Sequence, residues 1–356
     1  MKKTMKETIK KTGIVLSGKQ ILLRGTALAA GAALLAGWIL TGTTGISGED
    51  KKIYEEALEL QPYVDEAGFR DFKLKDYPVA MYDGKHDYVF YDGKIEKRDP
   101  VLETFAGTAY PVDDHFEVII PTMDRFESLL SLAGGVEGMA AGSGYGKEEQ
   151  AATIWHEAFH AWQLSRHQIL GERMTPEDFT QELEADPDQT GQSEDDLFVK
   201  EVDQKKDVKR SLEQEMRLLK KIVTGSATGK GNIDEVRTAV LEYRKLEDER
   251  REKMSEEAAD AERRCELTEG TAYYVEGTVL RAEKGNDGKM GYQERYLETL
   301  DRYEDGRGKY YRIGMAKCLI LDQLSPDWKE TLDFSKSLDE LLDAAVSAVQ
   351  QHGSVS

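Results

Sequence analysis

This chain is poor in cysteine and histidine, with two and six of these residues among 356. The two cysteines, Cys265 and Cys318, are too few for a disulfide framework, and no C-x-x-C pair occurs. They either form one bridge or remain two separate apolar residues of the core. Because histidine is rare, an H-E-x-x-H pattern is expected by chance in only about 1% of such chains. The occurrence of that pattern is therefore informative.

Basic residues are also few compared with acidic ones. The chain has 48 lysines and arginines against 68 aspartates and glutamates, which gives a formal net charge of -20. Binding of nucleic acid requires a basic face, and none is evident beyond the first two dozen residues. We therefore expect no nucleic-acid partner. The sequence does not indicate an oligomeric state.

One long uncharged run occurs, at residues 25–46, directly after the basic segment 1–24. The run is just long enough to span a bilayer as a helix. The basic flank predicts a cytoplasmic N-terminus, so we expect a single-pass membrane protein whose domain, residues 48–356, is extracellular. A signal peptide is the alternative, in which case cleavage of residues 1–46 would release a secreted protein.

The sequence pattern of the first part of that domain predicts a helix followed by a sheet. Residues 48–68 begin with an acidic cap and carry apolar residues at helical spacing. Over residues 77–121 apolar residues alternate with polar ones, and Asp83-Gly84 and Asp92-Gly93 are tight-turn signals. This pattern predicts an antiparallel sheet.

A glycine-rich segment, residues 134–146, follows the predicted sheet. It is either an edge strand around residues 136–140, which could bind a peptide by strand addition, or a flexible connection. The rest of the chain is mainly helical. The acidic loop and charged helical hairpin at residues 172–255 are interpreted as an insertion or lid. Helices are predicted over residues 124–132, 148–167, 176–183, 195–223, 232–283, 309–324 and 337–349.

The predicted helix at residues 148–167 contains the H-E-x-x-H pattern, formed by His156, Glu157 and His160. Residues four apart lie on one face of a helix, so the two histidines can present their imidazole nitrogens to one metal ion. Glu157 lies beside the first histidine and can take a proton from a water in an open coordination position of that ion. The pattern therefore predicts a site for metal-assisted hydrolysis.

A catalytic zinc ion usually has three protein ligands, so a third ligand is needed. His167 is too far along the same helix, at ~10 Å from His160 along the axis. A downstream acid is a better candidate, and Glu266, Glu269 and Glu276 all lie beside a stripe of small and apolar residues in the predicted helix at residues 232–283. A carboxylate that enters a core there must be paired or bind a metal.

The H-E-x-x-H pattern with a later glutamate on a second core helix resembles the gluzincin group of zincin metallopeptidases, and E-G-T-A-Y-Y-V-E from Glu269 is similar to the third-ligand helix of that group. The resemblance implies His156, His160 and Glu269 as Zn2+ ligands and Glu157 as general base, with Glu266 as the alternative ligand. It also implies an α+β, zincin-like fold: an N-terminal antiparallel sheet, an active-site helix and a mainly helical C-terminal part with a long helical insertion.

Two shorter segments resemble the aminopeptidase branch of that group. Tyr311-Arg312-Ile313-Gly314 is similar to an element whose tyrosine stabilises an oxyanion, and the segment around Glu137 is similar to an edge-strand motif, with Gly138 in place of its final asparagine. We therefore predict a zinc-dependent peptidase that hydrolyses extracellular peptides or proteins. The alternative is a catalytically inactive or partner-dependent zincin-like binding protein at the cell surface.

Overall fold

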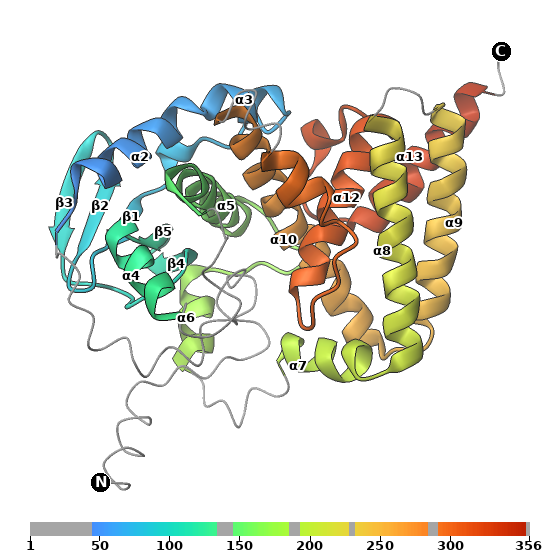
Figure 1. Cartoon of the computed structure of the whole chain (residues 1–356), viewed down its shortest axis with the longest axis horizontal. Helices are drawn as coiled ribbons and strands as arrows, with labels where there is room; N and C mark the ends of the chain where they lie inside the picture. The colour runs from blue at the N-terminus through green and yellow to red at the C-terminus, as the bar shows by residue number, and fades with distance from the viewer. Residues whose placement is uncertain (1–44, 134–144, 185–192, 228–231, 284–290, 354–356) are drawn as a thin grey trace, which may run out of the picture.

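The structure is a computed structural model that describes residues 45–133, 145–184, 193–227, 232–283 and 291–353. These residues form a mixed α/β protein with a five-stranded sheet in the first part and helices alone in the second (Figure 1). The glycine-rich residues predicted as an edge strand lie outside the described residues, as does Glu137. The strands are β1 (Val79–Tyr82), β2 (Asp87–Tyr91), β3 (Lys94–Arg98), β4 (Thr108–Val112) and β5 (His115–Pro121).

The sheet has the strand order β3-β2-β1-β5-β4 and is mixed. The pairs β1–β2, β2–β3 and β4–β5 are antiparallel, as predicted, but β1 and β5 run parallel, with Val79 opposite Val118. The prediction of a wholly antiparallel sheet is therefore wrong at this pair. Apolar alternation and turn residues identify the hairpins, but they do not determine how two hairpins join in one sheet.

The turns of the sheet follow the sequence signals. Asp92 and Gly93, with φ of 49° and 70°, form the two-residue connection between β2 and β3. Positive φ at both positions is typical of a tight hairpin turn and explains the Asp-Gly pair. At the preceding turn Gly84 has φ +93°, while the Asp83 carboxylate accepts hydrogen bonds from the amides of Lys85 and His86 at 2.8 and 2.7 Å.

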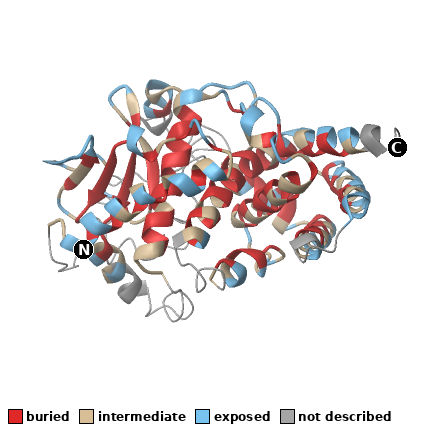
Figure 2. Cartoon of the chain, turned by 90° about the horizontal axis from the view of Figure 1, so that it is seen from above, coloured by how far each residue is buried: buried red, intermediate tan, exposed pale blue. Residues whose placement is uncertain are grey.

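Helices α2 (Gly48–Glu59) and α5 (Lys147–Arg166) pack together beside the sheet. Trp155 of α5 is fully buried, and its indole donates a 2.9 Å hydrogen bond to the Ala57 carbonyl of α2. Figure 2 shows that buried positions continue from the sheet through α5 into the central helices. The H-E-x-x-H helix therefore lies between the sheet and the helical half. The same half of the chain contains α3 (Gln61–Glu66), α4 (Met123–Ala133) and α6 (Pro176–Glu184).

The helical half begins with α7 (Glu194–Phe198) and α8 (Lys206–Ala227), so the predicted helix at residues 195–223 is interrupted. The predicted helix at residues 232–283 is likewise two helices, α9 (Ile233–Arg251) and α10 (Glu256–Glu283). The break between α9 and α10 has a local cause, because the Ser255 hydroxyl accepts a hydrogen bond from the Ala258 amide at 3.3 Å, as an N-cap does. Serine followed by two glutamates is a helix-start signal that the sequence already contained. The last helices are α12 (Gly308–Leu324) and α13 (Leu338–Gly353).

The structure bears on two further predictions, the membrane anchor and the pairing of the two cysteines. No helix of the described part is long and apolar enough to cross a bilayer, so a single-pass membrane protein is not supported; residues 25–44 of the predicted anchor lie outside the described residues. Cys265 and Cys318 are both buried and free, so they are core residues and form no bridge.

Candidate metal centre

The predicted ligands meet where α5 crosses α10. His156 and His160 lie one turn apart on α5, and their Nε2 atoms are 3.1 Å apart. Glu269 of α10 brings its Oε2 atom to 3.2 Å from Nε2 of His160 and to 3.6 Å from that of His156. All three side chains are buried, at 4%, 1% and 0% exposure. Two ring nitrogens and one carboxylate oxygen therefore converge on one point inside the protein.

The Nδ1 atom of His160 hydrogen-bonds a neighbouring side chain. Its Nδ1 lies 2.8 Å from Oε1 of Gln163, and the Gln163 amide donates to the Thr271 hydroxyl at 2.9 Å and to the Thr268 carbonyl at 3.2 Å. An amide oxygen only accepts, so Nδ1 of His160 carries the proton. Its Nε2 then presents a lone pair to the site.

His156 has a similar outer partner, the carboxylate of Glu276. Nδ1 of His156 lies 2.8 Å from Oε2 of Glu276, although the direction is not that of an ideal hydrogen bond. Glu276 also accepts a hydrogen bond from the Tyr296 hydroxyl at 2.8 Å. A carboxylate behind a histidine is a common outer partner of metal-binding imidazoles.

When His156 is neutral with its proton on Nδ1, three acceptor atoms face one another, and such atoms repel unless a cation or proton lies between them. A tetrahedral zinc ion with ligands at about 2.0–2.1 Å requires ligand atoms roughly 3.3 Å apart. The observed separations of 3.1, 3.2 and 3.6 Å match that value. The residues present therefore fit a zinc ion.

The structure separates the two candidate third ligands. Burial opposes ionisation of Glu269, but His160, His156 and Arg307 outweigh it and hold the pKa of this carboxyl well below its usual range. Glu266, one turn earlier on α10, accepts from the Lys317 ammonium at 2.6 Å instead. Burial raises the pKa of Glu266 to about 7. Glu269 is thus the carboxylate that faces the histidines.

Glu157 lies beside the histidines with its own carboxylate buried. A Cβ atom at Gly107, just before β4, would lie 2.8 Å from the Glu157 Cγ, so the glycine makes room for this side chain. No described group hydrogen-bonds its Oε2. Burial raises the pKa of Glu157, while the charges of His156 and His160 lower it. A carboxyl with a raised pKa and an unoccupied oxygen is suited to accept a proton near neutral pH.

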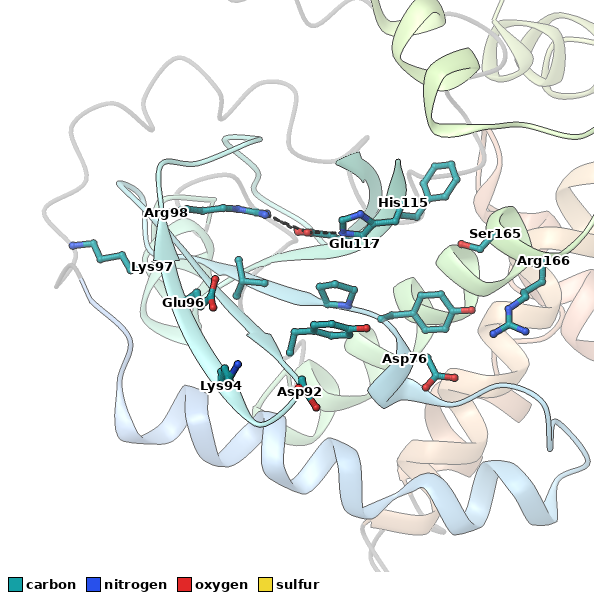
Figure 3. Close-up of a pocket in the computed structure, with 15 residues that line it drawn as sticks. Asp76, Asp92, Lys94, Glu96, Lys97, Arg98, His115, Glu117, Ser165 and Arg166 are labelled. Atoms are coloured by element: carbon teal, nitrogen blue, oxygen red, sulfur yellow. Dashed lines mark hydrogen bonds and ion pairs between the residues drawn. The ribbon is translucent and has the colours of Figure 1, made fainter. Parts of the chain in front are cut away.

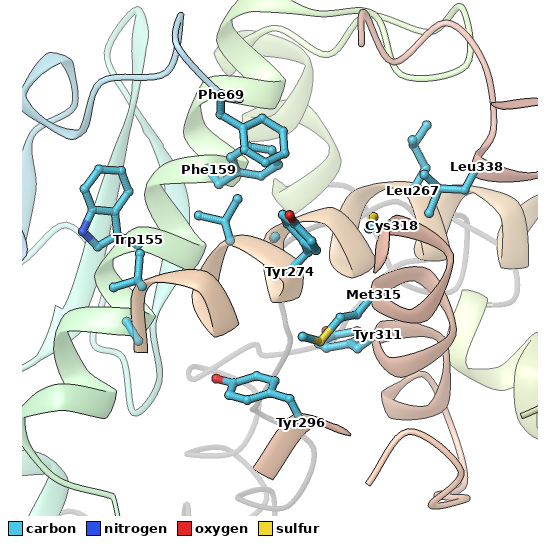
Figure 4. Packing of buried hydrophobic residues seen from close by; sticks show 14 of the residues in the cluster. Phe69, Trp155, Phe159, Leu267, Tyr274, Tyr296, Tyr311, Met315, Cys318 and Leu338 are labelled. Carbon is cyan, nitrogen blue, oxygen red and sulfur yellow. The ribbon is translucent and has the colours of Figure 1, made fainter. Parts of the chain in front are cut away.

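Tyr311 reaches the site from α12, where its ring centre is 6.3 Å from that of His156. Burial and the nearby Glu269 charge raise the pKa of its hydroxyl, so it remains a donor. No described group accepts a hydrogen bond of good geometry from it. The close approach of α12 depends on two glycines, because a Cβ at Gly270 would lie 2.4 Å from the Gly314 Cα. The resulting packing of α5, α10 and α12 is shown in Figure 4.

His167 is not brought to the site. It packs edge-on against Trp162 and at a tilt against Phe334, with ring centres 4.6 and 4.9 Å away. Among the residues that do surround the site, the sequence analysis did not identify Gly107, Gln163, Glu276 and Arg307 as site residues. Glu276 was placed on the helix face of Glu269 but given no role, and Gln163 could have been found from its spacing, three residues after His160. Gly107 and Arg307 carry no such signal.

A separate cavity of about 770 Å³ lies at the C-terminal end of α5 (Figure 3), and Ser165 and Arg166 form part of its lining. Its buried acid, Glu117, is paired with Arg98 at 2.5 Å and with His115 at 3.0 Å. None of the three predicted metal ligands lines this cavity. The cavity is therefore separate from the candidate metal centre between α5 and α10.

Comparisons with protein families, curated proteins and solved structures find no match to this chain.

Proposed function

We propose that the protein is a zinc-dependent peptidase, with His156, His160 and Glu269 as the metal ligands. The convergence of their three acceptor atoms within 3.6 Å of one another carries the proposal. A zinc ion bound there would act as a Lewis acid and lower the pKa of a water molecule. The resemblance to gluzincin peptidases supports the same ligand set and suggests peptide or protein substrates.

The protein groups around these ligands have complementary roles in the proposed reaction. Glu157, the general base, takes a proton from the attacking water and delivers it to the leaving amine. Tyr311 donates its hydroxyl proton in a hydrogen bond to the carbonyl oxygen as negative charge develops there. Both groups have a polar atom without a described hydrogen-bond partner, as expected of atoms that await a substrate.

The burial of the site favours a second candidate, a metal-binding protein without turnover. His156, Glu157, His160 and Glu269 are each no more than 4% exposed, so a substrate has little access to them in this conformation. This protein would bind zinc through the same ligands. It would hydrolyse no peptide.

Metal analysis and peptide cleavage by the full-length protein test both candidates. We expect about one zinc per chain, lost in Glu269→Gln and retained in the matched variant Glu266→Gln. Glu157→Gln should keep the metal and lose about 10²- to 10⁴-fold in the cleavage rate of a peptide library. Zinc binding without any cleavage by wild-type protein would support the second candidate. A wild-type protein that binds no zinc would contradict both.

A further inference from the structure

Arg307, the residue that precedes α12, lies next to the proposed metal ligands. It is 4% exposed, and its guanidinium lies among three carboxylates. Its Nη1 is 3.6 Å from Oε1 of Glu269, its Nη2 is 3.6 Å from Oε2 of Glu194, and its Nε is 3.6 Å from Oδ1 of Asp195. Arg307 is therefore the bridge between a proposed ligand and two acids of α7.

The two oxygens of Glu269 face different groups. Oε2 points to the Nε2 atoms of His156 and His160, whereas Oε1 points to Arg307. A carboxylate that is free to rotate can offer one or both oxygens to a metal, and its outer partners decide which it offers. The Arg307 cation on Oε1 favours binding through Oε2 alone.

Arg307 is itself held in place by the segment between α6 and α8. Asp203 accepts from the Gly306 amide at 2.7 Å and from the Lys309 ammonium at 2.9 Å, which fixes the start of α12. Gly306 has φ +75°, a conformation that favours glycine at this turn. Glu194 and Asp195 come from the same segment. This part of the predicted insertion therefore forms a wall of the site.

We propose that Arg307 is a positioning residue that restrains Glu269 to one-oxygen metal binding and is oriented by Glu194 and Asp195. The inference rests on the proposed zinc site but concerns a residue outside the ligand set. The planar guanidinium can approach Glu269 and the two acids of α7 at once, which the single ammonium of a lysine cannot reproduce. Loss of such an outer partner typically weakens metal binding 10- to 100-fold.

Zinc affinity of the full-length protein, measured by competition with a chromophoric chelator, tests this role without relying on activity. We expect Arg307→Gln to weaken zinc binding 10- to 100-fold and Arg307→Lys to weaken it less. Arg312→Gln is the matched control, because Arg312 lies on the same helix but pairs with Glu304 at 3.0 Å. Its zinc affinity should equal that of the wild type. Absorption of the cobalt-loaded Arg307→Gln protein should also weaken, because a two-oxygen Glu269 raises the coordination number.

The fold is checked by circular dichroism, because loss of the Arg307 charge leaves two acids without their partner. If Arg307→Gln does not fold, the variant Arg307→Gln/Glu194→Gln/Asp195→Asn removes all three charges and should show the same loss of zinc affinity. A folded variant that binds zinc as tightly as wild type, with an unchanged cobalt spectrum, would overturn the positioning role alone. A wild-type protein without zinc affinity would instead refute the proposed function.

Discussion

Two buried clusters in this protein have the same ligand-like geometry but different sources of positive charge. His156, His160 and Glu269 form one, and Glu247, Glu266 and Asp339 form the other; in each, the candidate ligand atoms lie within 4.8 Å of one another. The second cluster encloses the Lys317 ammonium, 2.8 Å from Glu247, 2.6 Å from Glu266 and in contact with Asp339. The first encloses no described lysine or arginine; burial opposes a charge on His156, but Glu269 and Glu276 outweigh it and raise the pKa of this imidazole well above its usual value. Geometry alone thus does not distinguish a metal site from an ion-pair cluster: Lys317 supplies the cation of the second cluster, whereas the first requires a metal ion or a proton on His156.

The two clusters share their supporting helices. Glu266 and Glu269 lie three residues apart on α10, while α12 contributes Lys317 to one cluster and Tyr311 to the other. The helical hairpin contributes Glu247, and it also contributes Arg251, which contacts Glu262, Glu266 and Asp339. The hairpin is therefore built into the core of the helical half, unlike a lid.

The largest effect is expected from removing the internal cation. Lys317→Met leaves Glu247, Glu266 and Asp339 buried without the ammonium between them, and the free energy of unfolding should fall by about 3–5 kcal/mol. Urea denaturation measures this change. Lys245→Met is the control, because Lys245 is 77% exposed and 3.8 Å from Glu249, and its effect should stay within about 0.5 kcal/mol. Equal stability of the two variants would contradict the role given to Lys317.

A smaller effect, which should reach both clusters, is expected where α10 crosses α12. A Cβ at Gly314 would lie 2.2 Å from the Glu266 carbonyl oxygen, so Gly314→Ala must separate α10 from α12. We expect a loss of roughly 1–3 kcal/mol in the free energy of unfolding. Zinc affinity should fall as well, because Arg307 and Tyr311 move with α12. Gly48→Ala is the control, since a Cβ there meets nothing within 4 Å. A fully stable Gly314→Ala protein would show that the glycine contact is dispensable.

The cluster of His156, His160 and Glu269 was easier to predict from sequence than the Lys317 cluster. The spacing of His156 and His160 is a local property of one helix, and a stripe of small residues indicated that Glu269 enters the core. Their meeting across α5 and α10 was an expectation that the geometry now supports. The Lys317 cluster joins α9, α10, α12 and α13, and no spacing within a single helix indicates which charges will meet.

The difference between signals within one element and contacts between distant segments also explains which parts of the fold were predicted. The presence of helices and the Asp92-Gly93 turn depend on neighbouring residues and were predicted, although three predicted helices, at residues 48–68, 195–223 and 232–283, are each divided. The parallel pairing of β1 with β5 depends on how distant segments pack, and it was missed. The break at Ser255 was missed for another reason, because a continuous charged pattern obscured its capping signal.

The smallest effect concerns pH and an acid next to the ion-pair cluster. Burial raises the pKa of Glu215 to about 7, although Arg250 contacts it at 2.9 Å and lowers that pKa. Because its ordinary value is 4.5, the folded state binds more protons than the unfolded state between about pH 4.5 and 7. The free energy of unfolding should therefore fall as pH rises through this range. Glu269, whose pKa is lowered, contributes no such slope there.

Urea denaturation of wild type and Glu215→Gln between pH 5 and 8 isolates this contribution. The variant has no titrating group at this position, so its free energy of unfolding should fall less over the range, by on the order of 2 kcal/mol. Acids remote from Arg250 titrate equally in both proteins and cancel in the difference. Glu242→Gln, at an exposed position of α9, should instead run parallel to wild type. Parallel curves for Glu215→Gln would mean that Arg250 compensates the buried charge completely, and the ion-pair cluster would then be as well balanced around Glu215 as it is around Lys317.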